Sequence, residues 1–163
     1  MRRPGPAAIG LVLAVLVLVL DQASKMAIYR VVMDPPRVIE VTGFLNLVLV
    51  WNPGISFGLL GEGSAVQTWV LAAFGTIVAG GVIAWLVLGG PARLTAVGAG
   101  LVAGGALGNV IDRLRFGAVM DFVDVHAYGW HWPAFNVADA AITVGVIGLL
   151  LDSLLQERAA RRT

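Results

Sequence analysis

The sequence contains no cysteine and few charged residues. Without cysteine the chain has no disulfide, no thiol nucleophile and no thiolate ligand for a metal. Charged residues make up 13% of the 163 residues, whereas they form about 25% of an average soluble domain. Hydrophobic residues make up 58%, and the mean hydropathy is +0.87. This composition predicts a single integral membrane domain over residues 1–163.

The chain also lacks a strong net charge and a metal-binding motif. Its net charge of +1 argues against nucleic acid as a partner. It has two histidines, His126 and His131, and no His-Glu-x-x-His sequence. They lie five residues apart in a tryptophan-rich stretch, which is more typical of a membrane interface than of a metal site. We expect no cofactor, and the alternative is a zinc hydrolase that uses these histidines with nearby carboxylates.

Four apolar segments are long enough to cross a membrane. The predicted spans cover about residues 7–28, 66–88, 94–113 and 137–155. The start of the first segment resembles a signal-peptide core, but no small-residue cleavage site follows it. A basic tail, 156–163, is expected to be disordered. The pattern predicts an all-α membrane protein with four transmembrane helices.

The region between the first two spans, about residues 29–63, has a different character. A Pro-Pro pair at 35–36 breaks any helix. Two β-branched, apolar stretches, 38–41 and 45–51, then flank a Thr-Gly turn at 42–43. This order predicts a small β-sheet or hairpin that lies outside the membrane.

Cationic residues predict the orientation of the chain, because cytoplasmic flanks of membrane spans are enriched in arginine and lysine. One side has two acids and six arginines: Arg2, Arg3, Arg93, Arg158, Arg161 and Arg162. The other side has five cations and eight acids. The first side is therefore predicted to be cytoplasmic, with both termini inside and the polar clusters at the outer face.

Two aspartates bracket the loop before the last span. Asp139 falls in the first turn of that span, where a carboxylate is costly and by default marks a functional site. If Asp121 lies beside it, the two carboxylates would share a proton and could activate water against a peptide carbonyl. The alternative is that Asn136 caps the helix and Asp139 supports its positive end. Taken alone, the motif favours this alternative.

Two further polar clusters lie at the ends of predicted spans. Asp21 and Lys25 are four residues apart and can pair on a helix, and this pair alone favours an ordinary interfacial role. Asn109, Asp112 and Arg113 share one helical face. They form a juxtamembrane salt bridge, or the amide of Asn109 and the guanidinium of Arg113 hold a peptide backbone beside Asp121.

Three glycines recur every four residues in the third span, at Gly100, Gly104 and Gly108. Such a stripe of small residues lets helix backbones approach closely. We predict helix packing there, with room for an extended peptide as a second expectation.

Five blocks of sequence, taken in order, closely resemble the bacterial lipoprotein signal peptidases (signal peptidase II). These blocks are Asp21-Gln-Ala-Ser-Lys25, Asn52-Pro-Gly54 with Phe57-Gly58, Gly105-Ala-Leu-Gly-Asn109-Val-Ile-Asp-Arg113, Val119-Met-Asp-Phe122 and Phe135-Asn-Val-Ala-Asp139. The match covers nearly the whole chain. Within the second block, Pro53, Ile55 and Ser56 differ from the usual pattern.

The resemblance implies a membrane aspartic endopeptidase of the bacterial inner membrane. Such an enzyme removes the signal peptide from prolipoproteins by cutting before a diacylglyceryl-modified cysteine, without a cofactor. Asp121 and Asp139 would be the catalytic pair. Residues that match supporting or substrate-contacting positions are Asp21, Lys25, Asn52, Gly54, Asn109, Arg113 and Asn136. The expected partners are prolipoproteins and membrane lipid, and we expect a monomer.

The extended conformation favoured by Phe122, Val123 and Val125 predicts that Asp121 and Asp124 point to opposite faces of a strand. The resemblance selects Asp121, which leaves Asp124 near water or His126. Asp139, at a helix N-terminus, is expected to be the more acidic partner. The non-enzymatic alternative is a proton-coupled carrier or a scaffold, although the charges cluster at one face of the membrane instead of crossing it.

Overall fold

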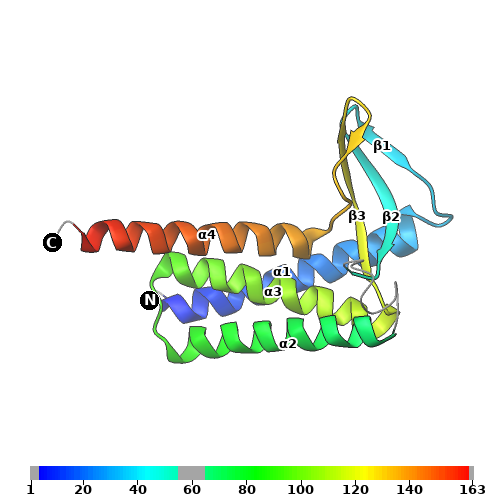
Figure 1. Cartoon of the computed structure of the whole chain (residues 1–163). Helices are drawn as coiled ribbons and strands as arrows, with labels where there is room; N and C mark the ends of the chain where they lie inside the picture. The colour runs from blue at the N-terminus through cyan, green and yellow to red at the C-terminus, as the bar shows by residue number, and fades with distance from the viewer. Residues whose placement is uncertain (1–3, 55–64, 162–163) are drawn as a thin grey trace.

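The computed structural model describes residues 4–54 and 65–161, in which four long helices form a bundle and four strands form a sheet at one end of it (Figure 1). The helices are α1 (Pro6–Ala27), α2 (Ala65–Leu88), α3 (Arg93–Phe116) and α4 (Val137–Ala160). Each is long and apolar enough to cross a membrane. The predicted four-helix membrane fold with a small sheet is confirmed.

Three helix ends differ from the predicted ranges. One turn of π-helix, η1 (Ile28–Val32), continues α1. Helix α3 continues to Phe116 and ends at Gly117, whose positive φ of 77° suits a glycine C-cap. Helix α4 continues to Ala160, so the expected disorder is wrong for residues 156–160. An ion pair one turn apart, between Glu157 and Arg161, supports this last stretch.

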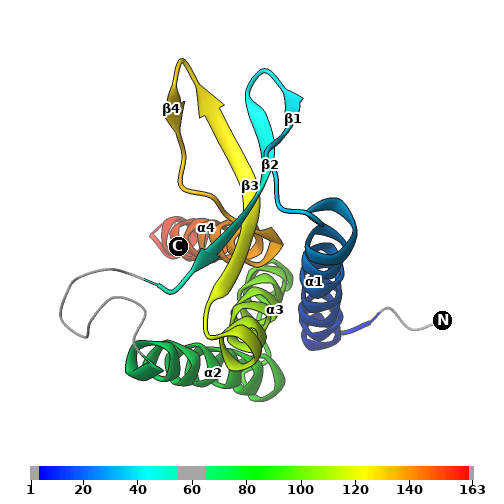
Figure 2. The ribbon, with the colours of Figure 1, turned by 90° about the vertical axis from the view of Figure 1, so that its right-hand side faces the viewer.

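Helix α3 lies at the centre of the bundle, between α1, α2 and α4 (Figure 2). Its glycine stripe faces α1. A Cβ atom added at Gly104 would lie 2.5 Å from the carbonyl oxygen of Ala14, and one at Gly100 would overlap the backbone of Gly10. The predicted packing role is confirmed. The expected room for a peptide is wrong, because the backbone of α1 fills it.

The sheet is antiparallel, with the strand order β1-β2-β3-β4. Its strands are β1 (Ile39–Thr42), β2 (Leu45–Asn52), β3 (Val119–Ala127) and β4 (Trp130–His131). The predicted hairpin is β1–β2, and β3 adds a long-range partner to it. Strand β3 turns back into β4, and a short loop after β4 leads into α4.

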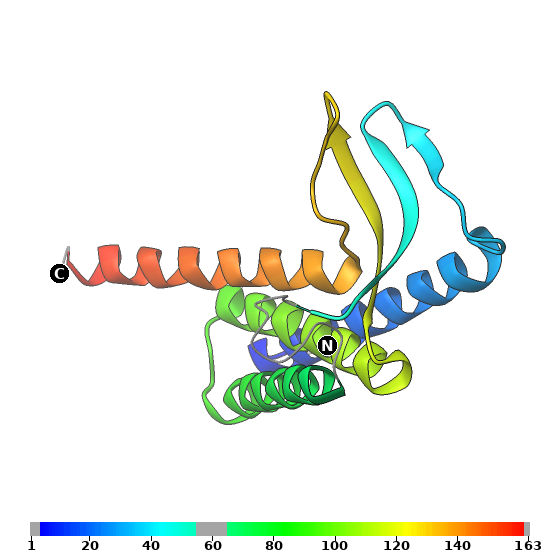
Figure 3. The ribbon, with the colours of Figure 1, turned by 45° about the vertical axis from the view of Figure 1, so that its right-hand side comes forward.

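The sheet lies at the end of the bundle opposite the start of α1 and the end of α4 (Figure 1). Its strands run across the bundle instead of along it (Figure 3). A small apolar core joins the sheet to the end of α1, through Ile28, Met33, Met120 and Phe122. This core fixes the start of β3, and with it Asp121, above the bundle.

Candidate active site

Asn136 joins the two aspartates that the sequence singled out. Its side-chain amide donates to Oδ1 of Asp121 at 2.7 Å, and its backbone N–H donates to Oδ2 of Asp139 at 3.2 Å. Asp121 is buried in β3 and Asp139 is half-buried in the first turn of α4. The fold therefore brings both carboxylates to one shared residue.

The same asparagine caps α4. Its side-chain oxygen accepts a hydrogen bond from the backbone N–H of Asp139 at 2.9 Å, which completes a capping box. The structural alternative considered from the sequence is thus present. It does not compete with the site, because the cap is what holds Asp139 beside Asn136.

Two further amides complete the surroundings of the carboxylates. Asn52, at the end of β2, donates to Oδ2 of Asp121 at 3.0 Å. Asn109, in α3, donates to Oδ1 of Asp139 at 2.8 Å. Asn52 also accepts from the backbone N–H of Gly54, whose φ of 114° is reserved for glycine. Each aspartate therefore receives side-chain donors from other elements of the fold.

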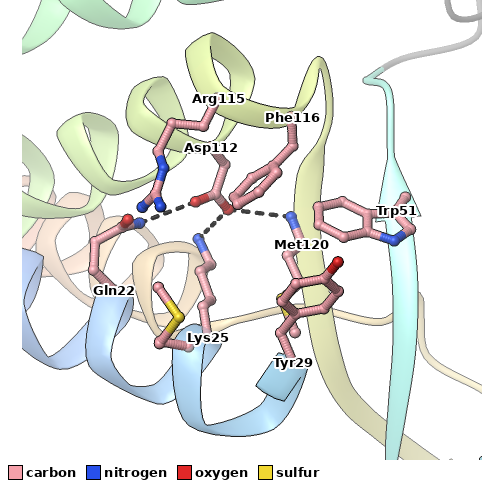
Figure 4. Close-up of a pocket in the computed structure, with 9 residues that line it drawn as sticks. Gln22, Lys25, Tyr29, Trp51, Asp112, Arg115, Phe116 and Met120 are labelled. Atoms are coloured by element: carbon pink, nitrogen blue, oxygen red, sulfur yellow. Dashed lines mark hydrogen bonds and ion pairs between the residues drawn. The ribbon is translucent and has the colours of Figure 1, made fainter. Parts of the chain in front are cut away.

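A buried charge cluster lies next to the two aspartates, and Figure 4 shows three of its members, Gln22, Lys25 and Asp112. The Nζ atom of Lys25 lies 2.8 Å from a carboxylate oxygen of Asp21 and 2.7 Å from one of Asp112. All three side chains are at most 5% exposed, so the interfacial role that the pair alone favoured is wrong. Gln22 donates to Asp112 at 2.9 Å and to Asp21 at 3.2 Å. The carboxylates and the ammonium compensate each other's burial.

This cluster holds the backbone next to both aspartates of the candidate site. Asp112 accepts a hydrogen bond from the backbone N–H of Met120, at 3.1 Å, and Met120 precedes Asp121. Asp21 accepts from the backbone N–H of Ala138, at 3.0 Å, and Ala138 precedes Asp139. The cluster thus positions the two chain segments that carry the candidate catalytic groups.

Two members of the cluster were not among the site residues expected from the sequence. Asp112 shares a helical face with Asn109, a signal that was visible but was also compatible with a surface salt bridge. Gln22 is adjacent to Asp21 and gives no signal of its own. Only the packing of α1 against α3 brings Gln22 to Asp112.

The guanidinium of Arg113 keeps a hydrogen-bond donor without a partner in the described part of the chain. Its Nη1 donates weakly to the backbone oxygen of Asn109 at 3.4 Å. Its Nε is buried and has no hydrogen-bond partner within residues 4–54 and 65–161. Its charge interacts with Asp139, Asp112 and Asp121. The structure therefore brings the expected guanidinium close to both aspartates.

The pKa of Asp121 is raised from 3.8 to about 6, mainly by burial. The nearby charge of Asp139 contributes to this rise, whereas hydrogen bonds from Asn52 and Asn136 and the charge of Lys25 oppose it. A carboxyl with this pKa can hold a proton near neutral pH. That property suits a general acid.

Asp124, also in β3, has different partners. It accepts from Asn46 at 2.9 Å and lies 2.9 Å from Nδ1 of His131. These hydrogen bonds lower the pKa of Asp124. The prediction that this stretch is extended and that Asp124 lies apart from Asp121 is confirmed. The expected proximity of His126 is also present, since the charge of His126 contributes to the lowered pKa of Asp124. The direct contact of Asp124 is with His131, on whose ring His126 stacks.

The zinc alternative rested on His126 and His131 with nearby carboxylates. Within residues 4–54 and 65–161, no three histidine, cysteine or acidic side chains converge closely enough to hold a metal ion. The geometry of the described residues instead concentrates polar chemistry around Asp121 and Asp139.

Comparison with known proteins points to one family. The chain is 46% identical over 149 residues to a lipoprotein signal peptidase of Methylobacterium radiotolerans, covering 89% of this chain and 85% of that one. It is 43% identical over 148 residues to a lipoprotein signal peptidase of Paraburkholderia phytofirmans, covering 91% and 86%. A solved bacterial membrane enzyme superposes with a TM-score of 0.76 at 30% identity, covering 93% and 90%. Since the family model described as signal peptidase (SPase) II also matches residues 13–155, the chain belongs to the signal peptidase II family.

Proposed function

We propose that this bacterial membrane protein is an aspartic endopeptidase that removes signal peptides from prolipoproteins. It would hydrolyse the peptide bond before a cysteine that carries diacylglycerol. Family membership supports the substrate class. The observation that carries the catalytic assignment is the link through Asn136, which binds the carboxylates of both Asp121 and Asp139.

In the proposed reaction Asp139 is ionised and Asp121 is protonated. Asp139 takes a proton from a water molecule as the water oxygen attacks the scissile carbonyl carbon. Asp121 donates its proton to the carbonyl oxygen, which gives a neutral tetrahedral diol. Collapse of the diol returns a proton to Asp121, and the proton on Asp139 passes to the leaving nitrogen. The two aspartates end the cycle in their starting states.

The surroundings of the two carboxylates support this division. Asp139 lies in the first turn of α4, where the positive end of the helix dipole stabilises a negative charge. Asp121 is buried, and its raised pKa favours the protonated form. The sequence led to the same division, with Asp139 as the more acidic partner.

The neighbouring residues would bind and position the substrate. The Nε of Arg113 has no partner in the part of the chain that the structure describes, and its planar group of donors suits a peptide carbonyl near the aspartates. Asn136 is buried, and its hydrogen bonds go to the protein, so we assign it to positioning the aspartates. Asn109 and Asn52 hold the carboxylates. Asp21 and Asp112, both paired with Lys25, hold the backbone next to them.

We also propose that both termini are cytoplasmic and that the active site faces the outside. The arginine distribution supports this orientation, as does the position of the sheet opposite the start of α1 and the end of α4. A reporter that works only in the cytoplasm should be active when fused after Arg162 or near Arg93. It should be inactive near Gly61 or Trp130, and an active fusion at Trp130 would reverse the orientation.

The decisive experiment uses the purified full chain in phospholipid bilayers. It is incubated with a prolipoprotein whose cysteine carries diacylglycerol, and the products are sized by mass spectrometry. The proposal expects a single cut before the modified cysteine, with and without a chelator. The unmodified precursor is the matched control and should be cut poorly. Intact lipidated precursor would contradict the proposal, and loss of activity with chelator would favour the zinc hydrolase.

A further inference from the structure

The free end of the sheet carries an exposed group of aromatic residues, which we call the aromatic tip. It consists of Phe44, in the β1–β2 turn, and Tyr128, Trp130 and Trp132, in and after the β3–β4 turn. Phe44, Trp130 and Trp132 are 61%, 62% and 57% exposed, and Tyr128 is fully exposed. The rings of Trp130 and Trp132 pack edge to face with centroids 5.8 Å apart. Trp130 and Trp132 therefore share one aromatic surface, and Phe44 lies on the neighbouring turn, where its backbone oxygen accepts from the N–H of His126.

The turn at the tip places an aromatic residue where the backbone disfavours it. Tyr128 has a φ of 51° and Gly129 a φ of 80°, so both central residues of this two-residue turn lie in the left-handed region. Asparagine, aspartate and glycine are preferred at the first of these positions. A bulky residue with positive φ is uncommon and costs backbone energy. Tyr128 is therefore not explained by the turn itself, nor by packing, since its side chain is exposed.

The direction of the strands places the tip beyond the side of the helix bundle. The strands run across the bundle and project past α4 on the side away from α2 (Figures 1 and 3). When the four helices cross a membrane, the space next to α4 is filled by lipid. The tip thus overhangs lipid at the membrane surface, and the sheet continues the membrane contact of the helices.

The composition of the tip matches that surface. Residues 125–138 contain no aspartate, glutamate, lysine or arginine, and none occurs between Glu40 and Glu62. Two carboxylates lie in the row of Asn46, behind the tip: Asp124, which is bonded to Asn46 and His131, and the exposed Glu40 in β1. Tryptophan and tyrosine are enriched where a membrane meets water, because an apolar ring and a polar N–H or O–H suit that layer. A neutral aromatic tip fits zwitterionic phospholipid headgroups.

We propose that the aromatic tip inserts into the headgroup layer of the bilayer on the side where the sheet lies. Strand β3 then has two fixed points, the tip at one end and Asp121 near the other. Insertion of the tip sets the height of β3, and hence of Asp121, relative to the membrane surface. The insertion itself does not depend on the proposed chemistry or on which side is cytoplasmic.

Fluorescence quenching by brominated phospholipids tests the insertion directly. In the test protein the full chain carries Trp51→Phe, Trp69→Phe and Trp85→Phe, which leaves Trp130 and Trp132 as its tryptophans. A reference protein keeps only Trp69, which is exposed near the start of α2 and lies at the same end of the bundle. Lipids brominated near the glycerol should quench both proteins more than lipids brominated near the chain ends. If bromolipids quench Trp69 but leave the tip unchanged, the tip is in water or covered by another protein, and the proposal is wrong.

Variants test the effect on β3. Trp130→Ser with Trp132→Ser should lower processing several-fold in bilayers and leave it near the parental rate in detergent micelles. Tyr128→Asn supplies a residue that the turn prefers, so it should fold at least as stably as the parent. It should nevertheless lower processing in bilayers. Equal losses in bilayers and micelles would assign the tip to folding, and no loss in either would remove its role in positioning Asp121.

Discussion

Asn136 donates its side-chain amide to the carboxylate of Asp121 at 2.7 Å, from the position that caps α4. One side chain therefore serves both the end of a membrane helix and a group in the neighbouring sheet. The two roles use different atoms, the oxygen for the cap and the nitrogen for Asp121. Substitutions can separate them.

Asn136→Ala should lose both roles, whereas Asn136→Ser should lose only the hydrogen bonds that the amide nitrogen donates to Asp121, Asn109 and the backbone oxygen of Met120. Loss of an N-cap costs about 1 kcal/mol, and serine retains an oxygen that can cap the helix. We expect thermal unfolding to show destabilisation for alanine and near-parental stability for serine. Both variants should process precursor poorly. Normal processing by Asn136→Ser would show that the amide donor is dispensable.

Asp121→Asn and Asp139→Asn should each abolish processing while the protein stays folded in the membrane. Asparagine keeps the shape and can accept hydrogen bonds, but it neither accepts the proton of water nor supplies an acidic proton. Asp124→Asn is the matched control, since it lies on the same strand with separate partners. It should remain substantially active. An active Asp121→Asn beside an inactive Asp124→Asn would reverse the assignment.

Processing should decline as the pH rises above about 6, because the proposed general acid, Asp121, loses its proton there. The free energy of unfolding should also decrease as the pH rises. The pKa of Asp121 is higher in the folded chain than its ordinary 3.8, so its contribution is largest below 3.8 and is lost as the pH rises to about 6. Thermal unfolding of Asp121→Asn should lack this component.

Asp124 should change the stability with pH in the opposite direction. Its pKa is lowered in the folded chain, so its contribution is present above the ordinary value and is lost as the pH falls through the lowered pKa. Asp124→Asn should therefore flatten the acid side of the stability profile. It should leave the decline of processing above about pH 6 in place.

Lys25→Met should destabilise the protein strongly, because it leaves the carboxylates of Asp21 and Asp112 buried without a cation. Breaking a buried ion pair by removing one partner costs about 3–5 kcal/mol. Glu157→Gln is the control, since it breaks the exposed pair with Arg161, and such a change should stay within about 0.5 kcal/mol. Thermal unfolding in detergent measures both. Equal effects would show that burial does not distinguish the two pairs.

Gly104→Ala should destabilise the bundle by about 1–3 kcal/mol, as overpacking does in a close-packed core. The added methyl would lie 2.5 Å from the backbone oxygen of Ala14, which cannot move without shifting α1. Gly148→Ala, in α4, meets no atom within 4 Å. Alanine is the better helix former, so this control should be neutral or stabilising by up to about 1 kcal/mol. The same melting experiment compares the two.

The sequence predicts the large elements well because their signals are local. Long uncharged runs define the four helices, and a Thr-Gly turn between β-branched stretches defines the β1–β2 hairpin. The capping box at Asn136 and Asp139 is likewise contained in four consecutive residues. Family resemblance supplies the remaining step, from separate motifs to one candidate site.

The predictions that the structure contradicts concern contacts between segments that are distant in the sequence. Asp21 and Lys25 look like an interfacial pair until α3 brings Asp112 to them, and a helix pattern carries no information about that third residue. Gly100 and Gly104 leave a space that the sequence cannot assign to α1 or to a substrate.

The place of Asp139 and Asn136 at the start of α4 has a consequence for biosynthesis. Helix α4 is the last element along the chain, and it follows every other part of the candidate site. During synthesis, α1, α2 and α3 can assemble with Lys25, Asp21 and Asp112 in place while the second carboxylate is still absent. Peptidase activity would therefore begin only after the final helix has left the ribosome and packed against α3, so that an incomplete chain is inert.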